Sequence, residues 1–212
     1  MFINNSLQEF IDVVASDNPT PGGGSVSALA GSLGGALTNM VGTLTIDKKV
    51  WADIPEDAKL KMETSFKEIE EKVNNLSKII DEDSTAFDDV MKAFKMPKET
   101  DEEKKARSNA IQEGYKHALE VPLKCAEECY RVLELQEVFA SHGNVNAITD
   151  VGVGTLLAYT GLEGALFNVT INLISVKDME YKKEIESRVS ALLKDGKRLK
   201  EKLIDTVYER LS

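Results

Sequence analysis

Apolar residues recur at intervals of three and four along most of this chain, which is the period of an α-helix with one buried side. The longest series runs from about Pro55 to Phe94 and alternates steps of four and three, so it predicts a long helix that lies along partner helices. No stretch shows the two-residue alternation of a strand. The pattern therefore predicts an all-α protein, a bundle of long antiparallel helices in a single domain over residues 1–212.

Helix boundaries are marked by capping residues and by proline and glycine. Ser6 with Glu9, and Thr100 with Glu103, have the spacing of capping boxes, and Asp178 is placed to cap the last helix. The first helix is expected to bury Leu7, Phe10, Ile11 and Val14. Two prolines and three glycines make 17–24 a loop, and Pro122 is expected to kink or divide the helix that starts after Thr100 and extends to about Val138.

The helix expected to start near Ser25 has two unlike sides. One side has the large residues Val26, Leu29, Leu33, Leu37, Met40 and Leu44, and the other has Ala28, Ser32, Gly35, Asn39 and Gly42. Each glycine inside a helix costs roughly 1 kcal/mol relative to alanine. We therefore expect another helix backbone or a ligand to approach the small side closely.

The charges are unevenly distributed. The chain of 212 residues has a net charge of −10, which argues against a nucleic-acid binder. Residues 18–46 hold no charge, and 143–176 hold only Asp150 and Glu163. The glycines, serines and prolines of the first neutral segment favour a buried helix over a membrane span. No basic-then-apolar leader is found at 1–10, so we expect no membrane association and a cytoplasmic location.

Asp83 interrupts the longest apolar series at a position where an apolar residue is expected. A lone carboxylate in such a position is costly unless it is paired, hydrogen-bonded or raised in pKa. It is either a structural residue that sets helix register or a general acid and base that works near neutral pH.

Two other groups of residues are candidates for a binding site. The glycine-rich turn Pro21–Ser25 precedes a helix, where free N–H groups favour an anion or a carbonyl oxygen, although it lacks the P-loop ending. In the second neutral segment, four amides and one carboxylate are suited to an uncharged heterocycle, but taken alone they are better explained by capping and helix–helix hydrogen bonds. These residues are Asn144, Asn146, Asp150, Asn168 and Asn172.

The residues do not suggest a metal site. His117 and His142 are too few and too far apart, and Cys125 and Cys129 lie one helical turn apart, where burial as small side chains is the better interpretation. We predict no metal.

Taken together, these motifs resemble those of the cyclodeaminase/cyclohydrolase family of one-carbon folate metabolism, and in particular the cyclodeaminase half of formiminotransferase-cyclodeaminase. The resemblance rests on the order and spacing of PTPGGGS at 19–25, DSTAF at 83–87, VMKA at 90–93, Val121-Pro122, GNVNAITD at 143–150 and FNVTINL at 167–173. It covers nearly the whole chain, although the formiminotransferase half is missing.

The resemblance implies a dimeric helical bundle with a folate site near the subunit interface and no cofactor beyond the tetrahydrofolate substrate. The family's catalytic aspartate corresponds to Asp83. The matched substrate-binding candidates, together with Asn39 from the small side of its helix, are Pro21, Gly22, Gly23, Gly24, Ser25, Asn39, Asn144, Asp150, Asn168 and Asn172. An anionic, possibly polyglutamated tail needs cations, for which Lys48, Lys49, Lys95 and Lys98 are candidates.

The implied reaction takes place at the carbon that bridges N5 and N10 of tetrahydrofolate. The favoured form is a formiminotetrahydrofolate cyclodeaminase, which releases ammonia and yields the 5,10-methenyl compound. The alternative is a methenyltetrahydrofolate cyclohydrolase, which yields 10-formyltetrahydrofolate. A helical scaffold without catalysis would explain the repeats, but it would not explain Asp83 together with PGGGS.

Overall fold

The computed structural model describes residues 1–212 and is entirely helical. The α-helices are α1 (Leu7–Val14), α2 (Gly23–Thr43), α3 (Glu56–Thr85), α4 (Asp88–Phe94), α5 (Asp101–His142), α6 (Ile148–Leu173) and α7 (Met179–Leu211). Three short 3-10 helices are η1 (Phe2–Asn4), η2 (Lys49–Asp53) and η3 (Val145–Ala147). The predicted all-α class is confirmed.

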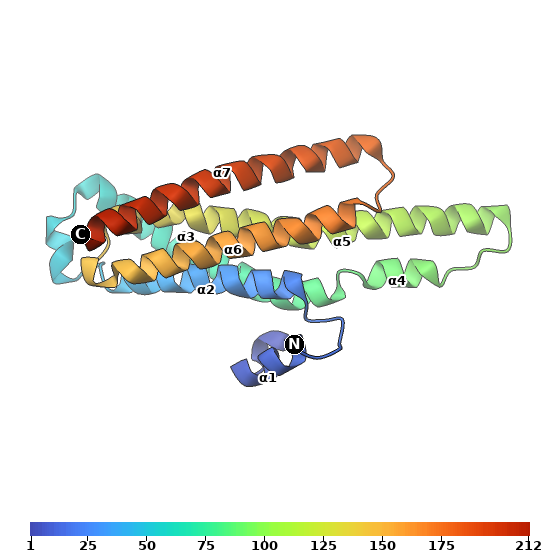
Figure 1. Ribbon diagram of the computed structural model, residues 1–212, viewed down its shortest axis with the longest axis horizontal. Helices are drawn as coiled ribbons and strands as arrows, with labels where there is room; N and C mark the ends of the chain where they lie inside the picture. Colours follow the sequence, from blue (N-terminus) through green and yellow to red (C-terminus); the bar gives the residue numbers. More distant parts are fainter.

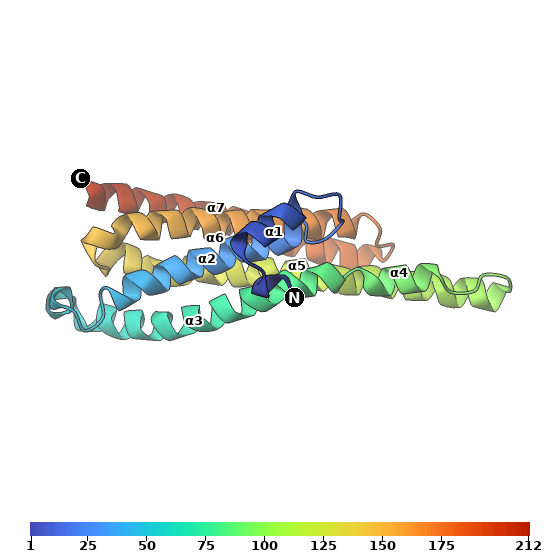
Figure 2. The same cartoon turned by 90° about the horizontal axis from the view of Figure 1, so that it is seen from below.

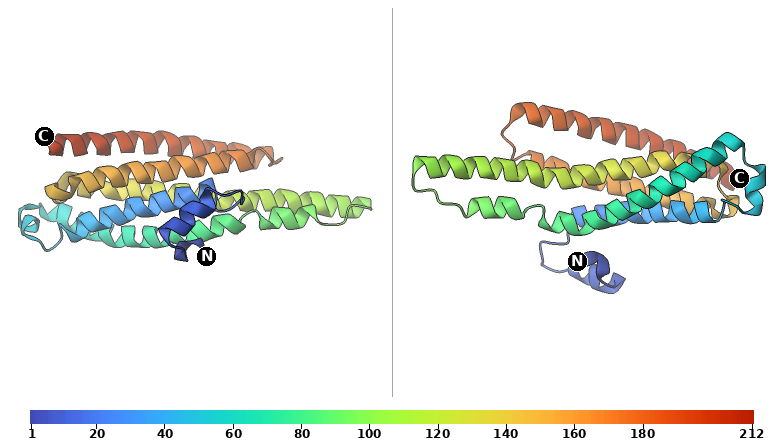
Figure 3. Two further views of the ribbon diagram at one scale, coloured as in Figure 1. Left: turned by 60° about the horizontal axis from the view of Figure 1, so that its bottom comes forward. Right: turned by 180° about the vertical axis from the view of Figure 1, so that it is seen from behind.

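Five long helices, α2, α3, α5, α6 and α7, run alongside one another and give the molecule an elongated shape (Figures 1 and 2). The first half of α5 extends beyond the others together with α4 and forms a projecting arm, while α1 stands apart from the bundle next to α2 (Figure 3). No helix is both long enough and apolar enough to cross a membrane.

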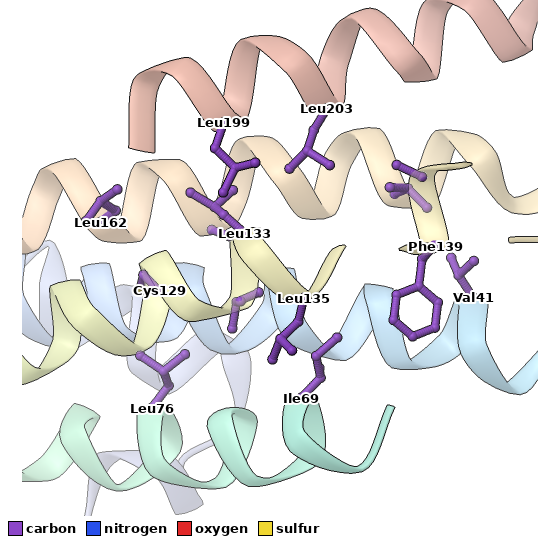
Figure 4. Close-up of a cluster of buried hydrophobic side chains, with 14 of the residues drawn as sticks. Val41, Ile69, Leu76, Cys129, Leu133, Leu135, Phe139, Leu162, Leu199 and Leu203 are labelled. Carbon is purple, nitrogen blue, oxygen red and sulfur yellow. The ribbon is translucent and has the colours of Figure 1, made fainter. Parts of the chain in front are cut away.

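The core lies between the long helices and contains side chains from all five of them. Figure 4 shows Val41 of α2, Ile69 of α3, Phe139 of α5, Leu162 of α6 and Leu203 of α7 in this cluster. Each of these side chains is almost completely removed from water. The helical period read from the sequence therefore identifies most of the buried side of α3, α5 and α7, whereas α2 buries its small residues.

Glycines bring α2 and α6 into close antiparallel contact. A Cβ on Gly34 would lie 2.7 Å from the Gly154 carbonyl oxygen and 2.8 Å from the Ala158 nitrogen, and a Cβ on Gly161 would lie 2.7 Å from the Ser27 carbonyl oxygen. Neither backbone leaves room for a side chain at these positions. The prediction of a close approach to the small side of α2 is confirmed.

The large side of α2 faces outward. Val26, Leu33, Met40 and Leu44 are 38–47% exposed. The adjoining outer surface of α6 is also apolar, and its most exposed members are Val153, Leu156, Phe167 and Ile171. We call these eight residues of α2 and α6 the outer apolar face.

The N-terminal segments differ from their predictions. The capping box of Ser6 and Glu9 is present, but Leu7 and Ile11 are 75% and 58% exposed and only Phe10 is buried, so the predicted burial of this side was wrong. Of the helix α1, only Phe10 reaches the core of the bundle. The helix α2 starts at Gly23, inside the segment predicted as a loop, because glycines are tolerated in its first turn.

The helix predicted over 55–94 is divided into α3 and α4 at Ala86–Phe87. The hydroxyls of Ser84 and Thr85 donate to the carbonyls of Asp81 and Glu82, three residues earlier, at 2.6 and 3.1 Å. Such local hydrogen bonds compete with the helical ladder, so α3 ends at Thr85, two residues after Asp83.

Pro122, in contrast, lies inside one continuous helix, so the predicted division of α5 was wrong. A proline has no N–H to donate to the carbonyl four residues earlier, here that of Ala118. That carbonyl accepts instead from Nδ2 of Asn172 on α6 at 3.3 Å. An amide from the neighbouring helix thus replaces a missing hydrogen bond of α5.

Candidate active site

The carboxylate of Asp83 lies against the first turn of α2. Asp83 belongs to the last turn of α3, and a Cβ on Gly24 would overlap its Oδ1. The carboxylate thus occupies the space that any other residue at position 24 would fill with its side chain. This contact accounts for the third glycine of the PGGGS turn.

The same contact places the negative charge at the positive end of a helix. The N-terminal cap of α2 is Gly22, whose lack of a side chain leaves the first N–H groups of the helix without a cap from their own segment. A carboxylate in front of them is stabilised by the helix dipole. Asp83 therefore caps α2 from another helix.

Ser25 connects Asp83 to the backbone of α3. Its side chain is fully buried, and its Oγ lies 2.8 Å from the Ile80 carbonyl oxygen and 3.2 Å from Asp83 Oδ2. Burial raises the pKa of Asp83, while hydrogen bonds from the side chain and the backbone of Ser25 act in the opposite direction. The net effect is a raised pKa, which is the direction that favours proton exchange closer to neutral pH.

Asn168 of α6 completes this part of the site. Its Nδ2 donates to the Gly164 carbonyl at 2.9 Å and lies 3.5 Å from the point where a Cβ on Gly23 would stand. Three helices, α2, α3 and α6, thus bring a carboxylate, exposed Gly23 and an amide to one corner of the bundle. We call Gly22–Ser25, Asp83 and Asn168 the Asp83 corner; Pro21 precedes it and is buried.

Asn172, one helical turn after Asn168, has its amide on the Ala118 carbonyl. This hydrogen bond replaces the one that α5 lacks at Pro122, so the predicted binding residue Asn172 has a structural role. The Ile80 carbonyl accepts a hydrogen bond from Ser25 of the Asp83 corner. The sequence does not indicate this contact, because every residue has a carbonyl.

Three further predicted residues, Asn39, Asn144 and Asp150, lie at the end of the α2–α6 pair that is far from Asp83. Asp150 and Asn168 share one side of α6 but are eighteen positions apart, which corresponds to about 27 Å along the helix. Asn39 is near the other end of α2, and its Oδ1 is buried without a hydrogen-bond partner. One chain does not bring these residues to Asp83.

Asn144 holds the loop between α5 and α6. Its backbone N–H donates to Thr45 Oγ1 at 2.9 Å, its Nδ2 donates to the Leu44 carbonyl at 3.0 Å, and its Oδ1 accepts from the Asn146 N–H at 3.0 Å. These contacts support the capping interpretation of this residue.

Asp83 is outside both of the larger grooves of the chain. One groove, of about 680 Å³, lies between α3, α5 and α7, and the other, of about 600 Å³, lies between α4, α5 and the start of α7. Both are lined mainly by charged and polar side chains. The Asp83 corner instead opens beside the outer apolar face.

Comparisons with known proteins identify the family of the chain. A sequence profile of the formiminotransferase-cyclodeaminase family matches residues 6–191. The methenyltetrahydrofolate cyclohydrolase of Methylorubrum extorquens is 40% identical over 209 residues, which are 99% of each chain. The formimidoyltransferase-cyclodeaminase of Mus musculus is 34% identical over 195 residues, and the present chain corresponds to only 35% of its length.

A solved structure has the same fold. The crystal structure of a formiminotetrahydrofolate cyclodeaminase from Thermotoga maritima superimposes with a TM-score of 0.78 at 29% identity, over 98% of this chain and 96% of that one. The chain belongs to the formiminotransferase-cyclodeaminase family, as its motifs predict.

Proposed function

We propose that this member of the family is a folate one-carbon enzyme that acts on the bridge between N5 and N10 of tetrahydrofolate, with Asp83 as its acid–base group. The observation that carries the proposal is the Asp83 corner, in which a half-buried carboxylate of raised pKa borders exposed Gly23 and the Asn168 amide. The relatives named above act on folates of this kind.

The cyclodeaminase reaction uses Asp83 as a proton shuttle. N10 of 5-formiminotetrahydrofolate attacks the formimino carbon, and a C–N bond forms to give a tetrahedral carbon. Asp83 takes the proton from N10 and delivers it to the amino group, which leaves as ammonia when its C–N bond breaks. The product is 5,10-methenyltetrahydrofolate. General acid–base catalysis of this kind contributes about 10²–10⁴-fold.

The cyclohydrolase reaction uses the same carboxylate but starts from 5,10-methenyltetrahydrofolate, which is the product of the cyclodeaminase reaction. Water adds to the 5,10-methenyl carbon while Asp83 accepts one of its protons, and this proton then goes to N5 as the C–N5 bond breaks. The remaining hydroxyl proton is released to solvent as the formyl C=O bond forms. The product is 10-formyltetrahydrofolate. The specific observation in favour of this reaction is the 40% identity to a cyclohydrolase from end to end of both chains, whereas the fold match is to a cyclodeaminase.

Two separate incubations distinguish the reactions. We expect purified protein to change the methenyl absorbance in one of them: growth from 5-formiminotetrahydrofolate indicates a cyclodeaminase, and accelerated loss from 5,10-methenyltetrahydrofolate indicates a cyclohydrolase. If neither rate exceeds that of a protein-free control, the proposed function is wrong.

The role of Asp83 is tested by Asp83→Asn, which keeps the shape and removes the titrating group. We expect the turnover number to fall about 10²–10⁴-fold while the helical circular dichroism signal and cooperative unfolding remain. Asp81→Asn, two positions earlier in α3, is the matched control and should keep most of the activity. Full activity in the Asp83 variant would exclude the catalytic role.

We also propose that a second copy of the chain covers the outer apolar face. An apolar surface formed by eight exposed large side chains is typical of an interface, and it lies on α2, which carries no charge, and α6, which carries only Asp150 and Glu163. A two-fold axis across the middle of α2 and α6 would bring Asn39 and Asp150 of the partner subunit to the Asp83 corner. Such a dimer would unite the two groups of predicted binding residues that one chain keeps apart.

Sedimentation and subunit mixing test this dimer. We expect Leu33→Glu with Phe167→Glu to give monomers, whereas Leu60→Glu, at a 68% exposed leucine of α3 outside the face, should stay dimeric. A mixture of equal amounts of inactive Asp83→Asn and Asp150→Ala dimers should regain about a quarter of the normal activity after exchange. About half of the dimers are then mixed, and one of the two sites in each mixed dimer is intact. A monomeric wild-type chain, or no regain on mixing, contradicts the shared site.

The lysines predicted to bind a glutamate tail lie at two ends of the molecule. Lys48 and Lys49 are at the start of η2, and Lys95 and Lys98 follow α4 on the projecting arm (Figure 1). Within one chain only the second pair is on the Asp83 side. We therefore expect Lys95→Glu with Lys98→Glu to weaken the affinity for polyglutamated folate more than for the monoglutamate, and equal effects on both would contradict a tail site on the arm.

A further inference from the structure

The hydroxyl of Ser25 faces two acceptors and has one proton. The Ile80 carbonyl oxygen, at 2.8 Å, only accepts, so this contact requires the Ser25 proton. Asp83 Oδ2, at 3.2 Å, accepts when ionised and donates when protonated. The side chain is fully buried, so water does not supply an additional donor.

The hydrogen-bonding pattern therefore differs between the two protonation states of Asp83. When Asp83 is protonated, its O–H donates to Ser25 Oγ, which donates to the Ile80 carbonyl, and all the groups are satisfied. When Asp83 is ionised, the Ser25 hydroxyl must turn from Ile80 to the carboxylate. The shorter contact to Ile80 is the one expected of the protonated state.

No charged side chain replaces Ser25 in this role. The helix α2 carries no charge, and neither does the turn of α6 around Asn168. On α3, Glu82 lies 3.8 Å from Lys124 of α5, and Asp81 accepts a hydrogen bond from the backbone of Phe2. The pKa of Asp83 is set by burial and by Ser25, without a contribution from these groups.

We propose that Ser25 is a positioning residue whose hydroxyl turns between the Ile80 carbonyl and Asp83 as Asp83 gains and loses the transferred proton. It acts through Asp83 and does not touch the substrate. A carboxyl that must take up and release a proton in one catalytic cycle needs support in both states, and a rotating hydroxyl provides it without moving either helix. This inference rests on the proposed function for its catalytic meaning, but the hydrogen-bond exchange exists without turnover.

The decisive variant is Ser25→Ala. Loss of the hydroxyl removes a bond that favours the carboxylate, so we expect the acidic limb of the kcat/KM profile to move to higher pH. We further expect kcat near neutral pH to fall about tenfold or more with little change in KM, because the substrate is not contacted. Ser25→Thr retains a hydroxyl and should restore the wild-type profile if it folds, which thermal unfolding will show.

The matched control is Ser32→Ala. Ser32 is also a buried serine of α2 that bonds to α3, with its Oγ 3.0 Å from Ser77 Oγ, but it does not contact a carboxylate. We expect it to lose similar stability without a shift of the pH profile. If Ser25→Ala and Ser32→Ala have the same profile, the positioning role is wrong and Ser25 only joins two helices.

Infrared titration of the Asp83 carboxyl keeps the test independent of turnover. The difference between wild-type and Asp83→Asn spectra isolates this carboxyl, and its midpoint should be higher in the Ser25→Ala background than in the Ser32→Ala background. An equal midpoint overturns the inference even if neither folate is converted. If neither folate is converted but the titration midpoint of Asp83 is higher in the Ser25→Ala background, the hydrogen-bond exchange is supported. Only the proposed function is then contradicted.

Discussion

The first turn of α2 and its middle are both glycine-rich and uncharged, yet different groups occupy the space next to them. At Gly24 that space holds the Asp83 carboxylate, the end of a side chain. At Gly34 it holds the Gly154 carbonyl and the Ala158 nitrogen, which belong to the backbone of α6. The same residue type thus makes room for a carboxylate in the first turn of α2 and for the backbone of a neighbouring helix about three turns later.

The difference lies in what is able to move. A carboxylate turns about its side-chain bonds at little cost, whereas a helix backbone is held by its own ladder and by the core behind it. A methyl group at position 24 should therefore displace the Asp83 carboxylate without disturbing the fold, whereas a methyl group at position 34 should strain the fold without displacing that carboxylate. The following predictions test this contrast.

The largest effect is expected for Gly24→Ala. The added Cβ would overlap Asp83 Oδ1, so the carboxylate must leave the first turn of α2, and we expect activity to fall about 10²-fold or more. The free energy of unfolding should change by less than about 1 kcal/mol, because alanine favours the helix. Steady-state kinetics and urea unfolding of the same preparation provide both quantities. An active Gly24→Ala enzyme would mean that the close contact is unimportant.

Gly34→Ala should have the opposite effects, a loss of stability without a loss of activity. Overpacking of two backbones costs typically 1–3 kcal/mol, which urea unfolding should detect, while the folded fraction retains its activity per molecule. Gly152→Ala is the control, since its Cβ would meet only the Val207 side chain at 3.2 Å, and it should be near neutral. Equal destabilisation at both positions would show that the backbone contact has no special cost.

The smallest effect concerns the pH dependence of stability. The pKa of Asp83 in the folded chain is raised by burial, above a value of about 3.9 in the unfolded chain. Between these two values the folded chain binds the additional proton, so its free energy of unfolding decreases as pH rises through this window.

Asp83→Asn lacks this titration. The unfolding free energy of the variant minus that of the wild type should therefore grow as pH rises from about 4 through the raised pKa and then stay constant. Urea unfolding at a series of pH values measures the difference. A difference that is flat or decreases with pH would mean that Asp83 has no raised pKa.

Much of the fold could be predicted from the sequence because helical spacing and caps are local. The capping boxes at Ser6 and Thr100 and the cap at Asp178 are all present. The break after Asp83 and the continuity of α5 through Pro122 were missed. The first depends on hydroxyls that compete with the helix, and the second depends on Asn172, which approaches from fifty positions away in the sequence.

The site could be predicted in part. Asp83 stands out because it breaks an apolar series, and PGGGS stands out by composition. The structure added only that these two groups are in contact. The sequence did not indicate that Ser25 would be buried against Asp83 or that Asn39 and Asp150 would lie far from it. The distances from Asp83 to these residues depend on which turns of neighbouring helices face each other, and the helical period does not determine that pairing.

By itself, the sequence determined that the chain is all-helical, where most helices begin, and that one aspartate stands among apolar residues, because these follow from residue type and spacing. Only the tertiary structure decided that the small side of α2 is buried while its large side faces outward. The period shows which residues share a side, but burial depends on how closely the next helix approaches. Glycine permits the closest approach, so α6 packs against the small side and the larger residues remain on the surface.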